Sequence, residues 1–201
     1  MHDLSTARRD ATTWDMAQVL DKDCFIVGYM VELTACVKLL YYNGFDQTCD
    51  TCVFYQGLST FCPVMILQDA KRNNKRQVVS SVAGPYKDGD WNLMYGYTTI
   101  TETMKNDWHN IELFVGWGGK NKNIVIDDVV IKPTTAAAAK KTDCTQLVKN
   151  GDAESGDARY WYIKGAGNFG KIEVNDGGAG GSSKYFAHTG VRSRVNMVSF
   201  I

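Results

Sequence analysis

The feature that most constrains this fold is a succession of short apolar segments separated by Gly, Asn and Asp residues. Six of them occur in the first two thirds of the chain: CFIVGYMVELTACVKLLYY at 24–42, CPVMILQDA at 62–70, RQVVSSVAG at 76–84, WNLMYGYTTI at 91–100, HNIELFVGWGG at 109–119 and NIVIDDVVIKP at 123–133. Runs of this kind, bounded by turn residues, indicate β-strands. The pattern therefore predicts an all-β fold, a jelly-roll β-sandwich of antiparallel strands.

The composition changes after Pro133. Residues 134–143, TTAAAAKKTD, have neither a strand pattern nor the turn residues of a hairpin, although the four alanines are compatible with a helical turn. Residues 144–201 are rich in glycine and return to short strand patterns such as RYWYI and KIEVN. We interpret 134–143 as a linker between two β-rich pieces.

Two adjacent carboxylates interrupt the apolar segment 123–133, at Asp127 and Asp128. Side chains alternate along a strand, so one carboxylate must point to each face of the sheet. A buried carboxylate without a partner is unfavourable, which predicts a bound partner for the inward one. By alternation Asp127 shares the face of Val129 and Ile131, which we expect to be the core, and Asp128 faces the other way.

Four motifs carry a resemblance to a known family. They are LVKNGDAESG at 147–156 with an aromatic pair soon after it, IVIDDVVIKP at 124–133, GYMVELTACVKL at 28–39 and DWNLMYGYTTI at 90–100. The first resembles the opening segment, the second the last strand, and the other two the inner strands of carbohydrate-binding modules of families four, nine and twenty-two. The resemblance implies a jelly-roll fold and binding of a polysaccharide without catalysis.

The order of these motifs is unusual, because the segment similar to the last strand precedes the segment similar to the opening one. Residues 1–133 therefore resemble the later two thirds of one module, and residues 144–201 the opening third of the next, as in a tandem array cut out of frame. Alternatively, a single module is circularly permuted. Residues 144–201 would complete either their own chain or a neighbouring chain, and the second route would build a head-to-tail filament.

The resemblance also implies a structural calcium ion that ties the opening segment to the last strand. Its side-chain ligands here would be Asp127 and Glu154, with Asp152 as a third. Carboxylate and carbonyl oxygens are the ligands that this hard cation takes. The alternative interpretation is that these carboxylates cap turns or form salt bridges.

The segment STARRDATTWDMAQ, at 5–18, is similar to a family segment whose Arg and Trp lie in the binding cleft. The resemblance implies that Arg9, Trp14 and Gln18 bind the sugar. The family has a glycine where this chain has Met16 or Ala17, which changes the shape expected of the cleft.

Three further tryptophans have different expected roles. Trp117, in the turn VGWGG, is a second ligand candidate, with a surface aromatic at a protein contact as the alternative. Trp91 and Trp161 match family positions that belong to the core, so we expect both to be buried.

Six cysteines occur, at positions 24, 36, 49, 52, 62 and 144. An even number at irregular spacing favours disulfides and an oxidising compartment, with the pairing left open. The alternative is a zinc site at CDTC, 49–52, with the two neighbouring cysteines as further ligands, but a second such pair is missing from the sequence.

Charge and hydropathy exclude several classes of function. The 22 basic and 22 acidic residues cancel, and KRNNKR, at 71–76, reads as a solvated loop, which argues against a nucleic-acid partner. No apolar run approaches the roughly 18 residues of a membrane span, and no apolar signal-peptide segment follows Met1. A glycosidase needs two carboxylates about 5–10 Å apart across a cleft, which adjacent strand residues such as Asp127 and Asp128 do not provide.

The sequence therefore predicts a non-catalytic carbohydrate-binding module that recognises an extracellular polysaccharide, with calcium as a structural ion. It would be secreted or held at a cell surface or wall. The alternative is a structural repeat unit of an extracellular wall, sheath or filament, whose partners are neighbouring copies of the chain.

Overall fold

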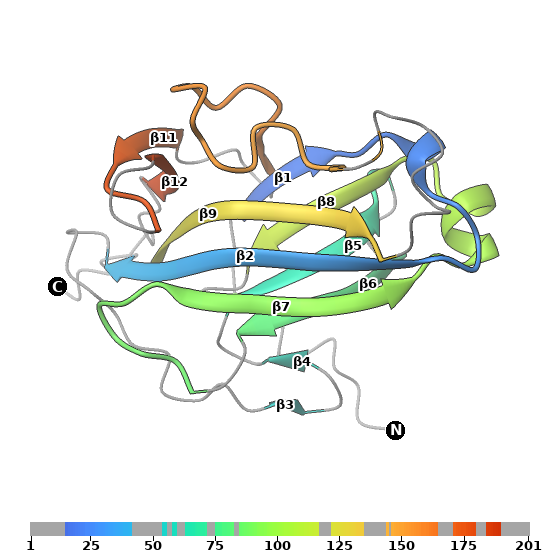
Figure 1. Ribbon diagram of the computed structural model, residues 1–201, viewed down its shortest axis with the longest axis horizontal. Coiled ribbons are helices and arrows are strands. Elements are labelled where there is room, and N and C mark those ends of the chain that lie inside the picture. Colours follow the sequence, from blue (N-terminus) through green and yellow to red (C-terminus); the bar gives the residue numbers. More distant parts are fainter. Residues whose placement is uncertain are drawn as a thin grey trace, which may run out of the picture.

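The computed structural model describes residues 15–41, 54–55, 58–59, 63–71, 75–82, 85–116, 122–134, 144, 146–164, 171–179 and 184–189 (Figure 1). The strands are β1 (Asp15–Val19), β2 (Met30–Tyr41), β3 (Phe54–Tyr55), β4 (Leu58–Ser59), β5 (Val64–Asp69), β6 (Arg76–Val82), β7 (Asn92–Thr99), β8 (Ile111–Gly116), β9 (Lys122–Pro133), β10 (Tyr162–Lys164), β11 (Lys171–Asp176) and β12 (Lys184–Thr189). Two short helices, η1 (Lys22–Cys24) and the π-type η2 (Thr103–Asp107), lie in the connections.

Ten of the strands form one antiparallel sheet in the order β10-β1-β8-β5-β6-β7-β2-β9-β12-β11, and β3 pairs with β4 separately. The sheet folds over itself, so that β2, β7 and β9 form a near layer and β1, β5, β6 and β8 a layer behind it (Figure 1). The prediction of an all-β, antiparallel sandwich is confirmed. The jelly-roll winding and the division into parts of two modules stay predictions.

The core lies between the two layers and follows from strand alternation. In β2 the odd-numbered residues from Val31 to Leu39 are buried, whereas the even-numbered residues between them are partly exposed. They pack against inward side chains of the far layer such as Met16, Met65 and Leu113. One apolar face per layer is the pattern expected when two sheets bury their faces against each other.

The near and far layers are joined where β6 meets β7, through the pairs Ser81–Tyr95 and Val82–Met94. Close approach of the two main chains requires glycine at position 96. A Cβ atom there would lie 1.9 Å from the carbonyl oxygen of Val79. Gly96 thus sets how tightly the two layers can join at this edge.

The residues after the linker complete the sheet of their own chain. β10 pairs with β1, and β12 pairs with β9 through Phe186–Ile126 and Ala187–Val125. All of the predicted linker except Thr134 lies outside the described residues. The two β-rich pieces are therefore parts of one sheet, as same-chain completion requires.

The segment similar to the family's opening motif runs along the second half of β9. The Leu147 amide donates to the Ile131 carbonyl oxygen (2.8 Å), and the Val129 amide donates to the carbonyl oxygen of Gly151 (2.9 Å). Gly151 lies so close to β9 that a Cβ would be 2.0 Å from the Val129 oxygen. The segment therefore covers the part of β9 that β12 does not reach.

Of the two tryptophans predicted to be buried, one is confirmed. Trp161 is 6 % exposed, packs on Phe186 and donates its indole N–H to the Asn150 carbonyl oxygen (3.1 Å). The prediction is wrong for Trp91, which is only partly buried and packs edge to face with Tyr185.

Candidate functional site

Most of the ligand-binding residues expected from the resemblance lie outside the described residues, namely Arg9, Trp14 and Trp117. Gln18 is described, and it is 1 % exposed. Its Nε2 donates to the Lys149 carbonyl oxygen (2.9 Å) and its Oε1 accepts from the Lys149 amide (2.7 Å). The side chain thus binds main chain and joins β1 to the segment that covers β9.

The expected orientation of Asp127 was wrong, because β9 contains a β-bulge. Thr34 pairs with Val130 and Cys36 with Asp127, so two residues of β9, Asp128 and Val129, oppose one residue of β2. The extra residue reverses the alternation. Asp127 consequently shares the outer face of Cys36, while Val129 still points into the core.

Asp127 is nevertheless fully buried, and its partners are main-chain amides. One carboxylate oxygen accepts from the Asp128 amide (2.8 Å), and the other accepts from the Ala179 amide, also at 2.8 Å. The second bond fixes the loop after β11 against β9. Amide donors stabilise a buried carboxylate in its charged form.

Asp128 is the extra residue of the bulge, with φ +49°, and its side chain is exposed. Its pKa is raised by burial first, and then by the negative charges of Asp152 and Glu154. The same region raises the pKa of the free, half-buried Cys36 thiol, by burial and then by Asp128 and Asp127.

The structure places two of the expected calcium ligands, Asp152 and Glu154, near Asp128, the residue that follows Asp127. Asp152 accepts from the Glu154 amide (3.2 Å), and Glu154 accepts from the Lys184 amide (2.6 Å). In the described part of the chain, no three His, Cys, Asp or Glu side chains are grouped so as to hold an ion. The carboxylates suit calcium by their chemistry, but several of their oxygens already accept main-chain hydrogen bonds.

The outer face of the near layer carries a row of exposed apolar side chains on β7. Leu93, Tyr95 and Tyr97 are 51 %, 46 % and 61 % exposed, whereas Met94 between them is fully buried. We call Leu93, Tyr95 and Tyr97 the tyrosine row. Its strand is hydrogen-bonded to β2 over its length, so the rings stand on a rigid surface.

Polar side chains of β2 and β9 lie beside the tyrosine row. Tyr95 is directly opposite Thr34 and Tyr97 is opposite Glu32. Glu32 in turn pairs with Lys132 of β9, at 3.6 Å. The face therefore combines two exposed rings with hydroxyl, carboxylate and ammonium groups.

Tyr95 and Tyr97 were not among the predicted ligand residues, because the resemblance to the family pointed to tryptophans instead. The signal was present in WNLMYGYTTI, where Tyr95 and Tyr97 alternate with Met94 and Gly96. Two aromatic residues on the face opposite an inward methionine are expected to meet solvent unless another element covers them.

The outer face of the far layer is different, because its apolar residues are buried. They form a second cluster of Ala17, Val64, Ile66 and Phe114, with Val78 packed against it. Near this cluster, on the same face, lies a polar group centred on Glu112 of β8, which is fully buried.

Three donors occupy the Glu112 carboxylate. The Tyr162 hydroxyl donates to Oε1, and the Lys164 ammonium and the Gln68 amide donate to Oε2, the latter at 3.3 Å. The pKa of Tyr162 is raised well above its ordinary value by burial and then by Glu112. Lys164 also donates to the Ala70 carbonyl oxygen (3.0 Å), so this group fastens β10 to the far layer.

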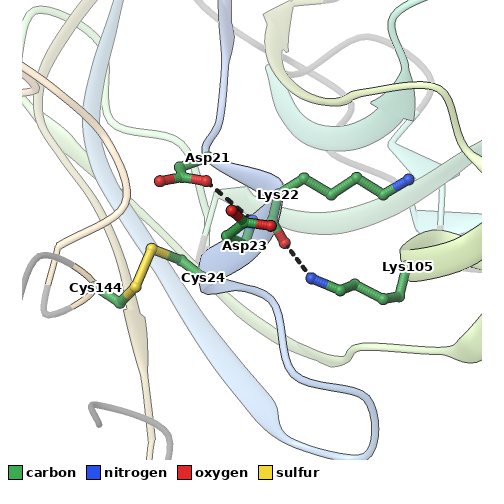
Figure 2. Close-up of a disulfide and its surroundings, with 6 residues drawn as sticks. All are labelled: Asp21, Lys22, Asp23, Cys24, Lys105 and Cys144. Atoms are coloured by element: carbon green, nitrogen blue, oxygen red, sulfur yellow. Dashed lines mark hydrogen bonds between the residues drawn. A yellow bond between two sulfur atoms is a disulfide. The ribbon is translucent and has the colours of Figure 1, made fainter. Parts of the chain in front are cut away.

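One disulfide is present among the described residues, between Cys24 and Cys144 (Figure 2). It joins η1 to the start of the segment that covers β9, across 120 residues of sequence. A disulfide is compatible with a secreted protein. Of the cysteines of the alternative zinc site, Cys49, Cys52 and Cys62 lie outside the described residues, and Cys36 is a free thiol on β2.

Together these features define an all-β sandwich with one covered outer face and one open face that carries exposed tyrosines. No protein-family model, no curated protein and no solved structure matches the chain. No helix in the described ranges is long and apolar enough to cross a membrane.

Proposed function

We propose that this chain is a non-catalytic carbohydrate-binding module that binds an extracellular polysaccharide on its open face. The observation that carries the proposal is the pair of exposed rings, Tyr95 and Tyr97, on a central strand. Monomeric proteins rarely expose grouped apolar side chains without using them for binding. The disulfide supports the extracellular location.

The geometry of the tyrosine row suits a sugar chain. Alternate residues of a strand are separated by about 6.5–7 Å, so the two rings can stack on successive parts of one extended chain. The apolar C–H faces of pyranose rings pack on aromatic rings. Thr34, Glu32 and Lys132 supply donors and acceptors for the hydroxyl groups at the edges of the sugar.

Calcium remains a prediction of the resemblance and belongs to the proposal as a structural ion. The resemblance gives Asp127, Asp152 and Glu154 as its ligands. The pKa of Asp128 is raised by burial first and then by the negative charges of Asp152 and Glu154, and a cation bound to those two carboxylates would relieve this repulsion. Thermal unfolding with calcium and with a chelator tests it. Equal melting temperatures in the two buffers would remove calcium from the proposal.

Affinity electrophoresis and calorimetry against a panel of polysaccharides test the function. Each tyrosine should contribute on the order of 1–2 kcal/mol, so the double variant Tyr95→Ala/Tyr97→Ala should lose at least about tenfold in affinity. Tyr160→Ala is the matched control, because Tyr160 is 54 % exposed but lies in a loop beside Lys149. The control should bind like the unmodified chain.

The alternative, a structural repeat unit, predicts a different result for the same variants. If the open face is an interface between copies, the unmodified chain binds no polysaccharide, and its self-association, measured by light scattering, is lost in Tyr95→Ala/Tyr97→Ala. Polysaccharide binding that survives the double variant would place the sugar site elsewhere on the chain.

A further inference from the structure

The tyrosine row continues beyond Leu93 to the residue that precedes β7, Trp91. Along this stretch the even-numbered residues are buried, whereas Leu93, Tyr95 and Tyr97 are exposed. Alternate residues of an extended chain point to one face, so Trp91 points outward with the tyrosine row. Its side chain is only partly buried, which leaves part of the indole accessible at the end of the row. We call Trp91, Leu93, Tyr95 and Tyr97 the extended row.

A second aromatic residue, Tyr185 of β12, lies on the same outer face. Its neighbour Phe186 belongs to the core, so Tyr185 points the other way. The ring centroids of Trp91 and Tyr185 are 5.7 Å apart, and the ring planes meet at 69°. Both residues lie at the end of the molecule where β7 begins, and β12 is found at that end (Figure 1).

The order of the strands shows how the two side chains are directed. β2 and β9 lie between β7 and β12, which places the main chains of β7 and β12 about 14 Å apart. Rings only 5.7 Å apart must therefore extend sideways toward each other over β2 and β9. Val125 and Ala187 point outward in this area and are 1 % and 3 % exposed, as expected beneath such a cover. Trp91 thus lies along the sheet and does not stand up as a barrier at the end of the row.

The contact with Tyr185 holds the indole in place before any ligand arrives. Tyr185 is itself fixed on β12, which pairs with β9 on one side and with β11 on the other. An aromatic side chain whose orientation is already set loses little entropy when a ligand packs on it. Tyr185 is therefore a positioning residue for Trp91.

The extended row is longer than a short sugar requires. From Trp91 to Tyr97 the chain spans six residues, or about 20 Å, of which Tyr95 and Tyr97 account for only about a third. Side chains in line on one strand contact successive units of a straight ligand, and a branch directed at the sheet would lift the ligand away from them.

We propose that the extended row binds an unbranched stretch of polysaccharide of four or more sugar units, with Trp91 as the platform at one end. The inference rests on the proposed function and specifies its ligand. The module then recognises the interior of a long, straight chain and not a terminal sugar or a short side branch.

Calorimetry with oligosaccharides of increasing length tests the inference. The probes are the disaccharide to hexasaccharide series of cellulose, xylan, mannan, a β-1,3-glucan and polygalacturonate. In the series that binds, affinity should rise by at least about tenfold from the disaccharide to the pentasaccharide and then level off. Trp91→Ala should abolish this rise and leave disaccharide affinity within about twofold of the unmodified chain.

Further variants separate the contribution of the indole from a contribution to folding. Trp91→Leu keeps an apolar side chain over the sheet but removes the ring, so it should abolish the rise as Trp91→Ala does. Tyr185→Ala should reduce the rise, whereas Tyr185→Phe keeps the aromatic contact and should preserve it. Tyr160→Ala is again the exposed control and should show the full rise. Thermal unfolding establishes that each variant is folded.

Failure of the inference is distinguishable from failure of the proposed function. Affinity that is equal from the disaccharide upward, or a rise that survives in folded Trp91→Leu, overturns the inference, even where binding still depends on Tyr95 and Tyr97. A polysaccharide that binds while every oligosaccharide series fails to bind overturns it too, because the extended row should accept a hexasaccharide. If no polysaccharide binds at all, the proposed function fails and the inference fails with it.

Discussion

The two outer faces of this sandwich have the same alternating strands but opposite exposure. On the far layer, Ile66 and Phe114 are buried and Glu112 is enclosed by Tyr162, Lys164 and Gln68. On the near layer, Tyr95 and Tyr97 remain open to solvent. Strand alternation predicts which side chains point away from the core. Which of these outward side chains are then buried by other elements depends on the complete fold.

This difference assigns separate roles to the two faces. The covered face fastens β10, and thereby the residues after the linker, to the rest of the sheet. The open face has a rigid strand and side chains that no other described element uses. We therefore expect substitutions on the covered face to change stability, and substitutions on the open face to change binding.

The largest expected effect is a loss of stability when the buried ion pair of the covered face is broken, compared with the exposed ion pair of the open face. Glu112→Gln should lower the free energy of unfolding by about 3 kcal/mol, because it removes the charge that balances Lys164 in a buried site. Lys164 keeps 19 % of its side chain exposed, which places the effect at the lower end for buried pairs. Lys132→Gln breaks the exposed pair with Glu32 and should cost about 0–1 kcal/mol.

Urea unfolding measures both variants, and calorimetry with the best polysaccharide measures binding. Glu112→Gln should still bind under conditions where it is folded. The assignment of roles fails if Lys132→Gln is the more destabilised variant, or if folded Glu112→Gln no longer binds.

Gly96 affects both the fold and the open face. It allows β7 to approach β6 closely, and it lies between Tyr95 and Tyr97. Gly96→Ala places a Cβ 1.9 Å from the Val79 oxygen and must shift β7. We expect a loss of about 1–3 kcal/mol in stability, together with weaker polysaccharide binding because both rings move. Unfolding curves and calorimetry on the same sample measure the two effects.

Gly156→Ala is the control for this prediction. A Cβ at Gly156 meets nothing within 4 Å, but its φ of +76° disfavours alanine. The strain should cost about 1 kcal/mol and leave binding unchanged. Unchanged binding in Gly96→Ala would contradict the use of the tyrosine row.

The sequence was sufficient for features that depend on local pattern. The repeated short apolar runs predicted the antiparallel all-β sandwich, and the even number of cysteines predicted a disulfide such as Cys24–Cys144. The burial of Trp161 was also predicted correctly.

It was insufficient where one residue changes the register. The bulge at Asp128 turns Asp127 to the face opposite the one that alternation predicts, and no composition signal marks it beyond the two adjacent aspartates. The partner of Asp127, the Ala179 amide, is a main-chain group whose position depends on a distant loop. The alternation indicated that Tyr95 and Tyr97 lie on the outer side of the sheet. It did not show whether another element covers that side.

Asp128 is an exposed residue beside the buried Asp127, and its substitution is expected to have the smallest effect. The pKa of Asp128 is raised in the folded state, so its charged form destabilises the fold. This destabilisation is complete at pH values above the raised pKa. It decreases as the pH falls through the raised pKa toward the ordinary value of 3.8. In the presence of a chelator at pH 7, Asp128→Asn should be more stable by less than about 1 kcal/mol, since solvent screens the repulsion. Asparagine also tolerates the left-handed φ of +49°.

Urea unfolding of the unmodified and variant chains across pH measures this gain, which should diminish as the pH falls below the raised pKa. Asp128→Ala removes the same charge but fits the left-handed backbone less well, so it should be less stable than Asp128→Asn at every pH. In calcium buffer the unmodified chain should be more stable than Asp128→Asn, because only the unmodified chain keeps the Asp128 carboxylate beside those of Asp152 and Glu154. A gain that is equal with calcium and with the chelator would show that Asp128 is a repulsive position and has no part in binding the ion.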